Sequence, residues 1–457
     1  MMRLSEAAKA LKAELIGADS AFTSVGADSR KIVPGQLFVA LKGEHFDGHD
    51  FAEQAIKQGA AAVLVSSPSS ATPAIVVKDT YQGLGELAAY WRNKFAMPVA
   101  AITGSNGKTT VKEMLASILR AAAKAPEAVL ATQGNLNNHI GLPLTMLNLN
   151  AQHRYAVIEM GMNHTGEISY LTKLAKPTVA LINNAGSAHI GELGSFEAIA
   201  RAKGEIFEGL ADDGIAVINA DDVFAPLWKT LIGQHETISF GLKNTADVSA
   251  SYELQADASA LDIKTPQGQF STVLPTPGLH NVMNALAATS AALAMGVELS
   301  AIAEGLQNYA GVKGRLQHLK GINGALVIDD TYNANPLSMK AAIDVLMAKS
   351  GEKLLVLGDM GELGDDAAAL HTEIGSYAKA AGVDALFTLG TLSQEMATAF
   401  GAGAKHYASA EALASELAAK LKATSVVLVK GSRFMAMERI VKEIITDKKT
   451  DKKEEAH

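Results

Sequence analysis

The sequence predicts an α/β fold divided among about three domains. The 457 residues exceed what a single hydrophobic core usually holds. Short apolar segments alternate with amphipathic helical segments along most of the chain, which is the order of parallel sheets covered by helices. One glycine-rich turn, residues 104–110, joins such an apolar segment to such a helix and indicates where a ligand binds.

The alternation divides the chain into three blocks and a tail. We expect a small α/β domain over residues 1–97, a central parallel-sheet domain over 98–312 and a Rossmann-like α/β domain over 313–446. The remaining residues, 447–457, are almost wholly charged and are expected to be disordered.

The expected strands are short, apolar on both faces and bounded by turn residues. In the first block they cover residues 37–41, 62–65 and 75–77, with a helix near 52–58. In the second they cover residues 99–102, 156–158, 179–182 and 215–218, followed by antiparallel strands within 249–274 and an alanine-rich helix from about Asn281. In the third they cover residues 326–328, 354–357 and 426–429. Several end in polar or glycine residues, and ligands of open α/β sheets bind at such strand ends.

Composition excludes several classes of protein and of site. The chain has no cysteine, so disulfides, thiolate nucleophiles and cysteine-ligated zinc are excluded. Its net charge of −8, without a basic stripe, argues against nucleic-acid binding. No apolar run approaches the roughly 20 residues that span a bilayer, and the N-terminus lacks a signal-peptide pattern. We therefore expect a cytoplasmic protein.

The glycine-rich turn has the parts of a phosphate-binding P-loop. Glycines allow backbone N–H groups to approach a phosphate, the helix N-terminus adds partial positive charge, and Lys108 adds a full one. The spacing departs from the usual motif because Ile102 occupies the first glycine position, and the alternative is a fortuitous turn. The expected nucleotide-binding residues are Gly104, Ser105, Asn106, Gly107, Lys108, Thr109 and Thr110, with the Thr109 hydroxyl placed to bind Mg²⁺.

A carboxylate lies at a neighbouring strand end. Glu159 directly follows an apolar strand and precedes Gly161. Carboxylate oxygen is the kind of ligand that Mg²⁺ prefers, whereas the alternative interpretation is an acid that caps a turn. Its position at the predicted sheet edge favours the metal.

Lys203 lies on the apolar face of a predicted helix. Ser195 is a natural N-cap, and Phe196, Ile199 and Leu210 share one stripe with Lys203. A lysine there must extend its amine to water, pair with an acid or lose its charge. Carbamylation by CO₂ would turn the amine into an anion able to bind metal. From spacing alone, the lysine that reaches water is the favoured interpretation.

Three further features have both a functional and a structural interpretation. His189 could contact a ligand, or be solvated in its loop. Residues 135–141 supply amides and glycine for a polar ligand, or for a turn. Arg315 could reach a γ-phosphate as an arginine finger does, or be a surface arginine.

In motif content and order the chain resembles the Mur ligase family, and within it the type that adds D-alanyl-D-alanine. Each motif alone is weak, but together they keep one order over all three blocks. They are Asp28-Ser29-Arg30, residues 34–41, Asp47-Gly48-His49, residues 103–110 and 135–143, Glu159-Met160-Gly161, His189, residues 202–206 and 278–285, Gly314-Arg315, residues 329–336 and Gly358-Asp359-Met360. The relative that adds diaminopimelate usually carries a DNPR motif, whereas this chain has residues 330–336 and 430–433 instead.

The resemblance implies an ATP-dependent, ADP-forming ligase of peptidoglycan synthesis. It would join D-alanyl-D-alanine to UDP-N-acetylmuramoyl-tripeptide through an acyl phosphate. The first domain would bind the UDP end, the second ATP and two Mg²⁺ ions, and the third would close over the site and admit the dipeptide. The implied partners are these small molecules, with a monomer as the expected state.

The resemblance also assigns roles to residues. It reverses the interpretation of Lys203, because the family carries a carbamylated lysine at the matching position. This carbamate, with Glu159 and His189, would hold the second Mg²⁺. The other implied contacts are Asn281 and Asn284 near adenine, Asp330 near the ribose, Arg315 at the terminal phosphates, Ser29, Arg30, Gly48 and His49 at the UDP moiety, and Asn137 and Asn138 at the substrate. The expected catalytic residues are Lys108, Lys203, His189 and Arg315.

Three alternatives are a Mur-type ligase for another amino acid, a P-loop ATPase that acts as a switch, and an inactive UDP-sugar-binding protein. A switch leaves residues 42–49 and 135–138 unexplained. A binding protein has no use for Lys108, Thr109 and Glu159 together. Folylpolyglutamate synthetases share the ATP module, but the N-terminal block argues against one. The third residue of the acceptor peptide, diaminopimelate or lysine, stays open.

Overall fold

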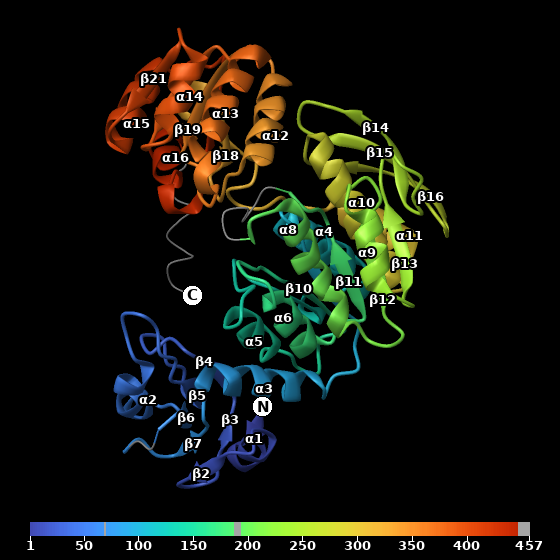
Figure 1. Ribbon diagram of the computed structural model, residues 1–457, viewed down its shortest axis with the longest axis vertical. Coiled ribbons are helices and arrows are strands. Elements are labelled where there is room, and N and C mark those ends of the chain that lie inside the picture. The colour runs from blue at the N-terminus through green and yellow to red at the C-terminus, as the bar shows by residue number, and fades with distance from the viewer. Residues whose placement is uncertain (68–69, 187–192, 447–457) are drawn as a thin grey trace.

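A computed structural model describes residues 1–67, 70–186 and 193–446. The chain forms three larger sheets, and Figure 1 shows the parts that contain them one after another along the long axis. Each of these sheets is built from strands of one predicted block, so the α/β class is confirmed. The domain limits at residues 97 and 312 stay predictions. The predicted disorder of residues 447–457 lies outside the described residues.

The N-terminal sheet has five strands in the order β2-β7-β6-β5-β4. Only β2 runs antiparallel to its neighbour. The strands are β2 Glu14–Ile16, β4 Ser24–Gly26, β5 Gln36–Val39, β6 Ala62–Val65 and β7 Ala74–Val76; β1 Met2–Arg3 and β3 Ala21–Phe22 pair separately. The helices are α1 Leu4–Ala10, α2 Ala52–Lys57 and α3 Thr80–Arg92. The side chain of Asp79 caps α3 by accepting the N–H groups of Tyr81 and Gln82.

The central sheet has six parallel strands in the order β13-β12-β11-β8-β10-β9. These are β8 Val99–Thr103, β9 Val129–Ala131, β10 Tyr155–Glu159, β11 Val179–Ile182, β12 Ile215–Asn219 and β13 Glu236–Phe240. One face packs against α4 Lys108–Ala123, α10 Leu279–Ala294 and α11 Leu299–Gln307, and the other against α5 Gly141–Met146, α6 Glu167–Ala175, α8 Phe196–Gly204 and α9 Ala225–Ile232. Because both faces are covered, all five residues of β8 are buried, as the uniformly apolar strand predicts.

The helix that carries Lys203 is shorter than predicted. Ser195 caps it as expected, and its hydroxyl accepts the N–H of Ala198 at 3.1 Å. However, α8 ends at Gly204, and a 3₁₀ turn follows at Glu205–Gly209. Phe196 is 48% exposed, so the predicted apolar stripe from Phe196 to Leu210 is wrong at its first residue.

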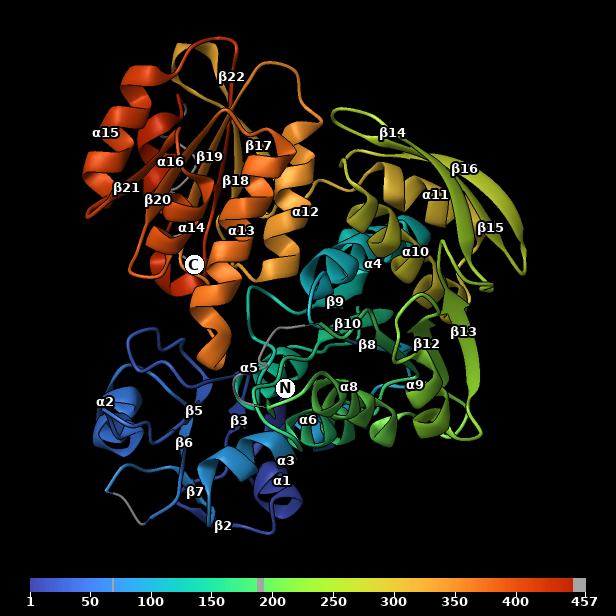
Figure 2. The ribbon, with the colours of Figure 1, turned by 45° about the horizontal axis from the view of Figure 1, so that its top comes forward.

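A three-stranded antiparallel sheet follows, which confirms the prediction for residues 249–274. Its strands are β14 Ser249–Leu254, β15 Ser259–Thr265 and β16 Gly268–Leu274. Figure 2 shows this sheet at the edge of the molecule, with one end beside α12. There, the Lys349 ammonium contacts the Asp257 carboxylate at 2.7 Å and the Ala256 carbonyl. His318 lies 3.4 Å from the same carboxylate. This contact is termed the hairpin contact.

The C-terminal sheet has the order β17-β18-β22-β19-β20-β21, with β17 the antiparallel edge strand. The strands are β17 Gln317–Lys320, β18 Leu326–Asp330, β19 Glu352–Gly358, β20 Ala385–Leu389, β21 Ala404–Tyr407 and β22 Ser425–Lys430. The helices are α12 Pro336–Met347, α13 Ala367–Ala381, α14 Ser393–Phe400, α15 Ala410–Lys420 and α16 Glu438–Ile444. Within the described ranges, no helix is both long and apolar enough to cross a membrane.

Candidate nucleotide and substrate site

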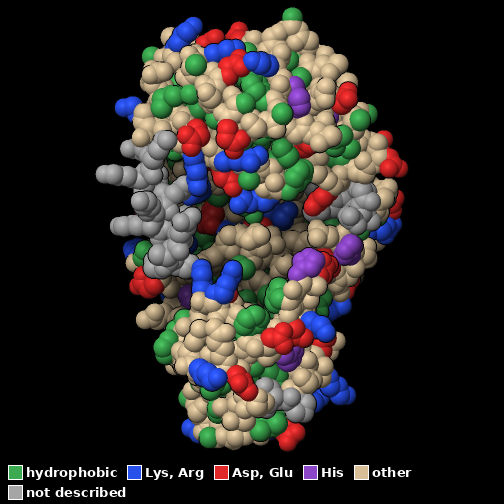
Figure 3. All heavy atoms as spheres, turned by 90° about the vertical axis from the view of Figure 1, so that its left-hand side faces the viewer, with side chains coloured by type: hydrophobic (Ala, Val, Ile, Leu, Met, Phe, Trp, Pro, Cys, Tyr) green, Lys and Arg blue, Asp and Glu red, His purple; other side chains and the backbone are tan. Residues whose placement is uncertain are grey.

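A cleft of about 1030 Å³ lies where the central sheet faces the C-terminal sheet. Its walls come from the carboxyl ends of β8, β10 and β11 on one side and of β18, β19 and β22 on the other. Figure 3 shows a hollow between the upper and lower parts of the molecule, with lysine and arginine side chains around it. Carboxyl strand ends meet here, as expected for an open α/β sheet.

The glycine-rich turn forms one edge of this cleft. Gly107 has φ +78°, and a Cβ there would lie 2.4 Å from the side-chain oxygen of Asn284, so only glycine fits. The Asn106 N–H donates to the Asn184 side chain at 2.8 Å, and the Asn183 amide donates to the Asn106 carbonyl at 2.9 Å. These two asparagines hold the loop in shape. The predicted residues that line the cleft here are Ser105, Asn106, Gly107, Lys108 and Thr110, with Gly104 and Thr109 adjoining them.

Lys108 is the first residue of α4, and its ammonium donates to the Gly104 carbonyl at 2.6 Å. Burial lowers the pKa of Lys108, and the positive charge of Arg315 lowers it further. The carboxylates of Glu159 and Glu362 act in the opposite direction. An anion in the cleft would stabilise the charged lysine in the same way.

Arg315 reaches the phosphate-binding loop from the C-terminal side. Its Nη2 donates to the Thr109 hydroxyl at 2.9 Å, and its guanidinium carbon lies 4.3 Å from the centre of the Tyr332 ring. Its buried Nε has no hydrogen-bond partner in the described part of the chain. The interpretation of Arg315 as an ordinary surface arginine is therefore wrong, and a donor remains for a ligand.

Glu159 is the last residue of β10 and is 3% exposed. Its Oε1 accepts the side-chain amide of Asn137 at 2.8 Å, whereas its buried Oε2 has no partner among the described residues. A buried carboxylate oxygen without a partner is costly, and a bound cation would satisfy it. The residues present therefore fit Mg²⁺. Among the described residues, no group of three or more His, Asp or Glu could hold a metal alone.

Two residues that the sequence did not single out support Glu159. The Glu159 N–H donates to the hydroxyl of Thr132 at 2.9 Å. The buried ammonium of Lys112 donates to the Thr132 carbonyl at 2.5 Å and contacts Glu113 at 2.6 Å. Lys112 lies one helical turn after Lys108 on a buried face of α4. This spacing could have indicated from the sequence that Lys112 lies near the phosphate-binding loop.

We expect Thr132→Val to raise the Mg²⁺ concentration needed for half-maximal activity. Valine keeps the shape but leaves the buried Glu159 N–H without an acceptor, a loss of about 1–3 kcal/mol of stability. Thr145→Val is the matched control, because the Thr145 hydroxyl donates to Gly141 inside α5, outside the cleft lining. Equal Mg²⁺ requirements in the two variants would show that Thr132 does not position Glu159.

Lys203 is 1% exposed, so the interpretation that its amine reaches water is wrong. Burial lowers the pKa of Lys203 well below its usual value, and the charge of nearby Lys108 lowers it further. No carboxylate of the described residues pairs with it. A neutral, nucleophilic amine is the form that reacts with CO₂, so carbamylation is chemically compatible with the site. His189 lies outside the described residues.

The residues expected around adenine and ribose line the same cleft. Asn284 accepts the amide of Asn183 at 2.9 Å, and Asn281 donates to the Pro277 carbonyl at 2.8 Å. Asp330 accepts the ammonium of Lys430 at 2.6 Å. Lys430 is the last residue of β22. Its contribution to the site could have been suspected from the sequence, because it belongs to the motif at residues 430–433.

The residues expected to contact UDP lie in the N-terminal part, outside the cleft lining. Exposed Arg30 pairs with Asp28 at 2.8 Å, and Ser29 lies between them in the chain. His49 follows buried Gly48; its Nδ1 lies 2.6 Å from Asp47 and its Nε2 accepts the Ser66 N–H at 2.9 Å.

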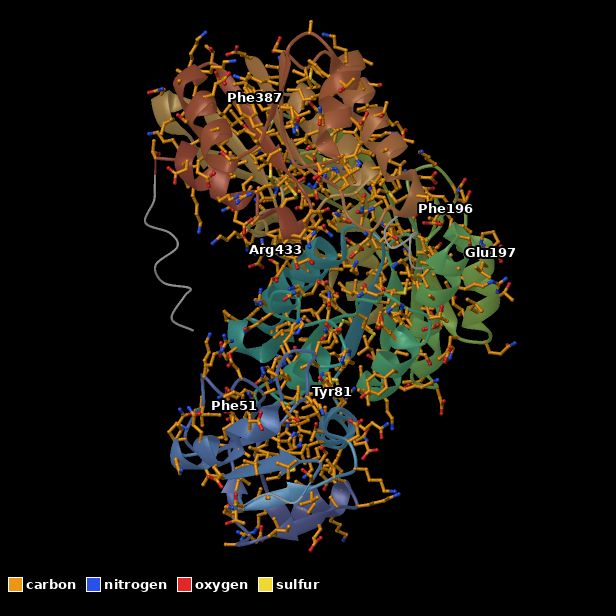
Figure 4. All side chains as sticks on the ribbon, turned by 60° about the vertical axis from the view of Figure 1, so that its left-hand side comes forward. Phe51, Tyr81, Phe196, Glu197, Phe387 and Arg433 are labelled. Atoms are coloured by element: carbon orange, nitrogen blue, oxygen red, sulfur yellow. The ribbon has the colours of Figure 1, made fainter. Side chains whose placement is uncertain are left out.

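A smaller cavity of about 290 Å³ adjoins the cleft at Asn138, and Asn137 lines the cleft beside it. The ring of Tyr81 on α3 lies 5.5 Å from that of His139, another residue shared by the two cavities. Figure 4 labels Tyr81 where the N-terminal part meets the central one. A long ligand could therefore extend from the cleft towards the N-terminal sheet.

Comparison with known proteins agrees with this architecture. The description "Mur ligase middle domain" matches residues 102–292, "Mur ligase, glutamate ligase domain" matches 314–433, and "Mur ligase family, catalytic domain" matches 21–92. The UDP-N-acetylmuramoyl-tripeptide–D-alanyl-D-alanine ligase of Escherichia coli (strain K12) is 44% identical over 444 residues, which cover 96% of this chain and 97% of the relative. The chain belongs to the Mur ligase family.

Solved Mur ligase structures share the whole architecture. A MurF structure from Acinetobacter baumannii superposes with a TM-score of 0.89 at 38% identity, covering 96% of this Mur ligase and 97% of that chain. A MurF ligase from Thermotoga maritima in complex with ADP gives a TM-score of 0.80 at 29% identity, covering 92% and 96%. The three-domain architecture expected from the sequence is therefore confirmed.

Proposed function

We propose that this Mur ligase adds D-alanyl-D-alanine to UDP-N-acetylmuramoyl-tripeptide, with ATP converted to ADP and phosphate. The identity of 44% over nearly the full length to a ligase of that name supports the reaction. The observation that carries the proposal is the cleft itself, where the phosphate-binding loop, the unpartnered oxygen of Glu159 and the free Nε of Arg315 meet. ATP as the nucleotide is supported by the ADP complex of the Thermotoga maritima ligase.

In the proposed reaction the tripeptide carboxylate attacks the γ-phosphorus of ATP, and ADP leaves. Lys108 contacts the Gly104 carbonyl and Arg315 contacts the Thr109 hydroxyl, so both charges lie at the loop and stabilise the negative charge of the transferring group. Mg²⁺, when bound at Glu159 and Thr109, would supply further charge neutralisation. The dipeptide amine then attacks the acyl phosphate, the C–N bond forms, and phosphate leaves.

The remaining assignments are part of the same proposal. Lys203 would carry a carbamate that, with Glu159 and His189, would hold a second Mg²⁺. Asn281, Asn284 and Asp330 contact the nucleoside of ATP. The UDP contacts are Ser29, Arg30, Gly48 and His49, and the peptide passes Asn137 and Asn138. A cytoplasmic monomer stays the expected state.

Phosphate release tests the proposal directly. The purified protein is incubated with ATP, Mg²⁺ and UDP-N-acetylmuramoyl-tripeptide, with and without D-alanyl-D-alanine. We expect release that requires both substrates and a UDP-N-acetylmuramoyl-pentapeptide by mass spectrometry. Release that is indifferent to the dipeptide would instead indicate a ligase for another amino acid or an ATPase switch. Parallel assays with lysine- and diaminopimelate-containing tripeptides decide the acceptor.

A further inference from the structure

We propose that Asn335 is a positioning residue for the phosphate-binding loop. It turns the side-chain amide of Asn106 so that the NH₂ group of Asn106, and not its oxygen, faces the phosphates of the nucleotide. Both residues line the cleft, and the arrangement described so far gives Asn335 no role. The inference rests on the nucleotide-binding part of the proposed function and is independent of the acceptor dipeptide.

A contact between the C-terminal and central parts places Asn335 at the loop. Its side-chain amide donates to the side-chain oxygen of Asn106 at 2.7 Å, across 229 residues of the chain. Asn335 directly precedes α12 and is 8% exposed, and Figures 1 and 2 show α12 where the C-terminal part meets the central part. A Cβ on Gly186 would lie 3.0 Å from the Leu337 side chain, so the first turn of α12 packs closely on the central part.

A backbone group decides which way the two amides point. The Ser338 N–H can only donate, and the side-chain oxygen of Asn335 accepts it at 2.9 Å in the N-cap of α12. The other end of the Asn335 amide is therefore its NH₂ group, which needs an acceptor. The oxygen of the Asn106 amide is that acceptor. The polarity of one helix end thus fixes the orientation of an amide in the phosphate-binding loop.

This orientation leaves Asn106 with one donor for a ligand. Its backbone N–H donates to Asn184, and its carbonyl accepts the side-chain amides of Asn183 and Asn184. Its side-chain oxygen accepts Asn335, whereas its side-chain NH₂ group has no hydrogen-bond partner among the described residues. Ionised phosphate oxygens accept hydrogen bonds, so an NH₂ group that faces them stabilises the nucleotide and a carbonyl oxygen in its place repels it.

The contact also relates nucleotide affinity to the position of the C-terminal part. Asn183 and Asn184 hold the backbone of Asn106 from within the central part. Asn335 reaches the Asn106 side chain only when the first turn of α12 lies at the loop. Without that contact, the Asn106 amide can turn either end towards the phosphates. The set of phosphate donors is therefore complete only when the C-terminal part is in place.

Two substitutions separate this role from the helix cap. Serine and aspartate cap a helix N-terminus about as well as asparagine, so the melting temperature should be unchanged in Asn335→Ser and Asn335→Asp. The measurement is the dissociation constant of a non-hydrolysable ATP analogue with Mg²⁺, by isothermal titration calorimetry. Asn335→Ser is too short to hold the Asn106 amide and should raise this constant by about 3- to 10-fold. Asn335→Asp offers only acceptors, so the Asn106 amide should turn its oxygen to the phosphates and the constant should rise by about 10- to 100-fold.

A double variant tests whether the effect passes through Asn106. In an Asn106→Ala background, Asn335→Ser should weaken binding no further, because no amide remains to be positioned. Ser409→Asp is the matched control: it places an aspartate at the N-cap of α15, in the same part but away from the cleft lining, and should keep wild-type affinity.

Three results would overturn the positioning role. They are wild-type affinity in Asn335→Ser, the same loss for Asn335→Ser with and without the Asn106 side chain, and a loss in Asn335→Asp no larger than in Asn335→Ser. A wild type that does not bind the ATP analogue at all would instead overturn the proposed function.

Discussion

The Lys108→Ala variant is expected to fold and to lose at least about 100-fold in kcat, the scale on which a single electrostatic stabiliser acts. Lys108 is the first residue of α4, and its ammonium donates to the Gly104 carbonyl of the phosphate-binding loop. Burial already lowers the pKa of this lysine, so removing its charge relieves a desolvation cost. Stability should therefore change little while transition-state stabilisation is lost.

The measurement is ATP-dependent phosphate release in the presence of both substrates. Arg120→Ala is the matched control, because Arg120 lies in the last turn of the same helix and does not line the cleft. Melting curves of both variants establish that the fold is intact. Near-normal ligation by Lys108→Ala would mean that the loop is not the phosphate site.

The second large effect is expected at Lys203. Lys203→Met should abolish ligation and leave the protein at least as stable, because methionine fills a similar volume without a charge to desolvate. Lys203→Arg should be equally inactive, because a guanidinium does not form the carbamate. In the wild type, activity should fall in CO₂-depleted buffer and return with bicarbonate. A fully active Lys203→Met protein would show that the lysine has only a structural role.

The free energy of unfolding of the wild type relative to Lys203→Met should depend on pH, and the sign of this dependence can be predicted. The folded-state pKa of Lys203 lies below its unfolded value of about 10.4, so between these two values the unfolded chain binds more protons. In CO₂-free buffer, the free energy of unfolding of the wild type should therefore rise relative to that of Lys203→Met as the pH rises through this window. Urea unfolding of both proteins at several pH values measures the difference. A difference that does not vary with pH would show that the lysine is equally charged in both states.

Local sequence signals predicted the elements well where local chemistry decides the structure. The uniformly apolar run of β8 indicated a strand covered on both faces, and all its residues are buried. Ser195 indicated a helix start, and it caps α8. The end of α8 was missed because distant residues set it: the Trp228 indole donates to the Ala200 carbonyl at 3.0 Å, and the Leu231 side chain packs against Gly204.

The site was predictable only in part for the same reason. Each P-loop residue is a neighbour of the next in the chain, so the motif could be recognised. Lys112 and Thr132 meet across 20 residues, and Arg315 meets Thr109 across 206. The local pattern could indicate a buried lysine or an arginine that reaches the phosphate site, but it does not identify Thr132 or Thr109 as the partner. The burial of Lys203 also depends on tertiary packing, and spacing alone favoured an amine that reaches water.

The hairpin contact attaches the C-terminal part to the central part at a place separate from the chain segment 308–316 and from the contacts within the cleft. Lys349 and His318 belong to the C-terminal part, whereas Asp257 belongs to the central one. A domain that is attached to its neighbour at two separate places can rotate chiefly about the line that joins them. While the Lys349–Asp257 pair holds, we expect the cleft-lining segments of the C-terminal part to approach the phosphate-binding loop by rotation rather than by sliding along it. Loss of that pair would allow rotation about more than one axis. The same cleft residues would then have many more orientations in which the two parts do not form the closed site.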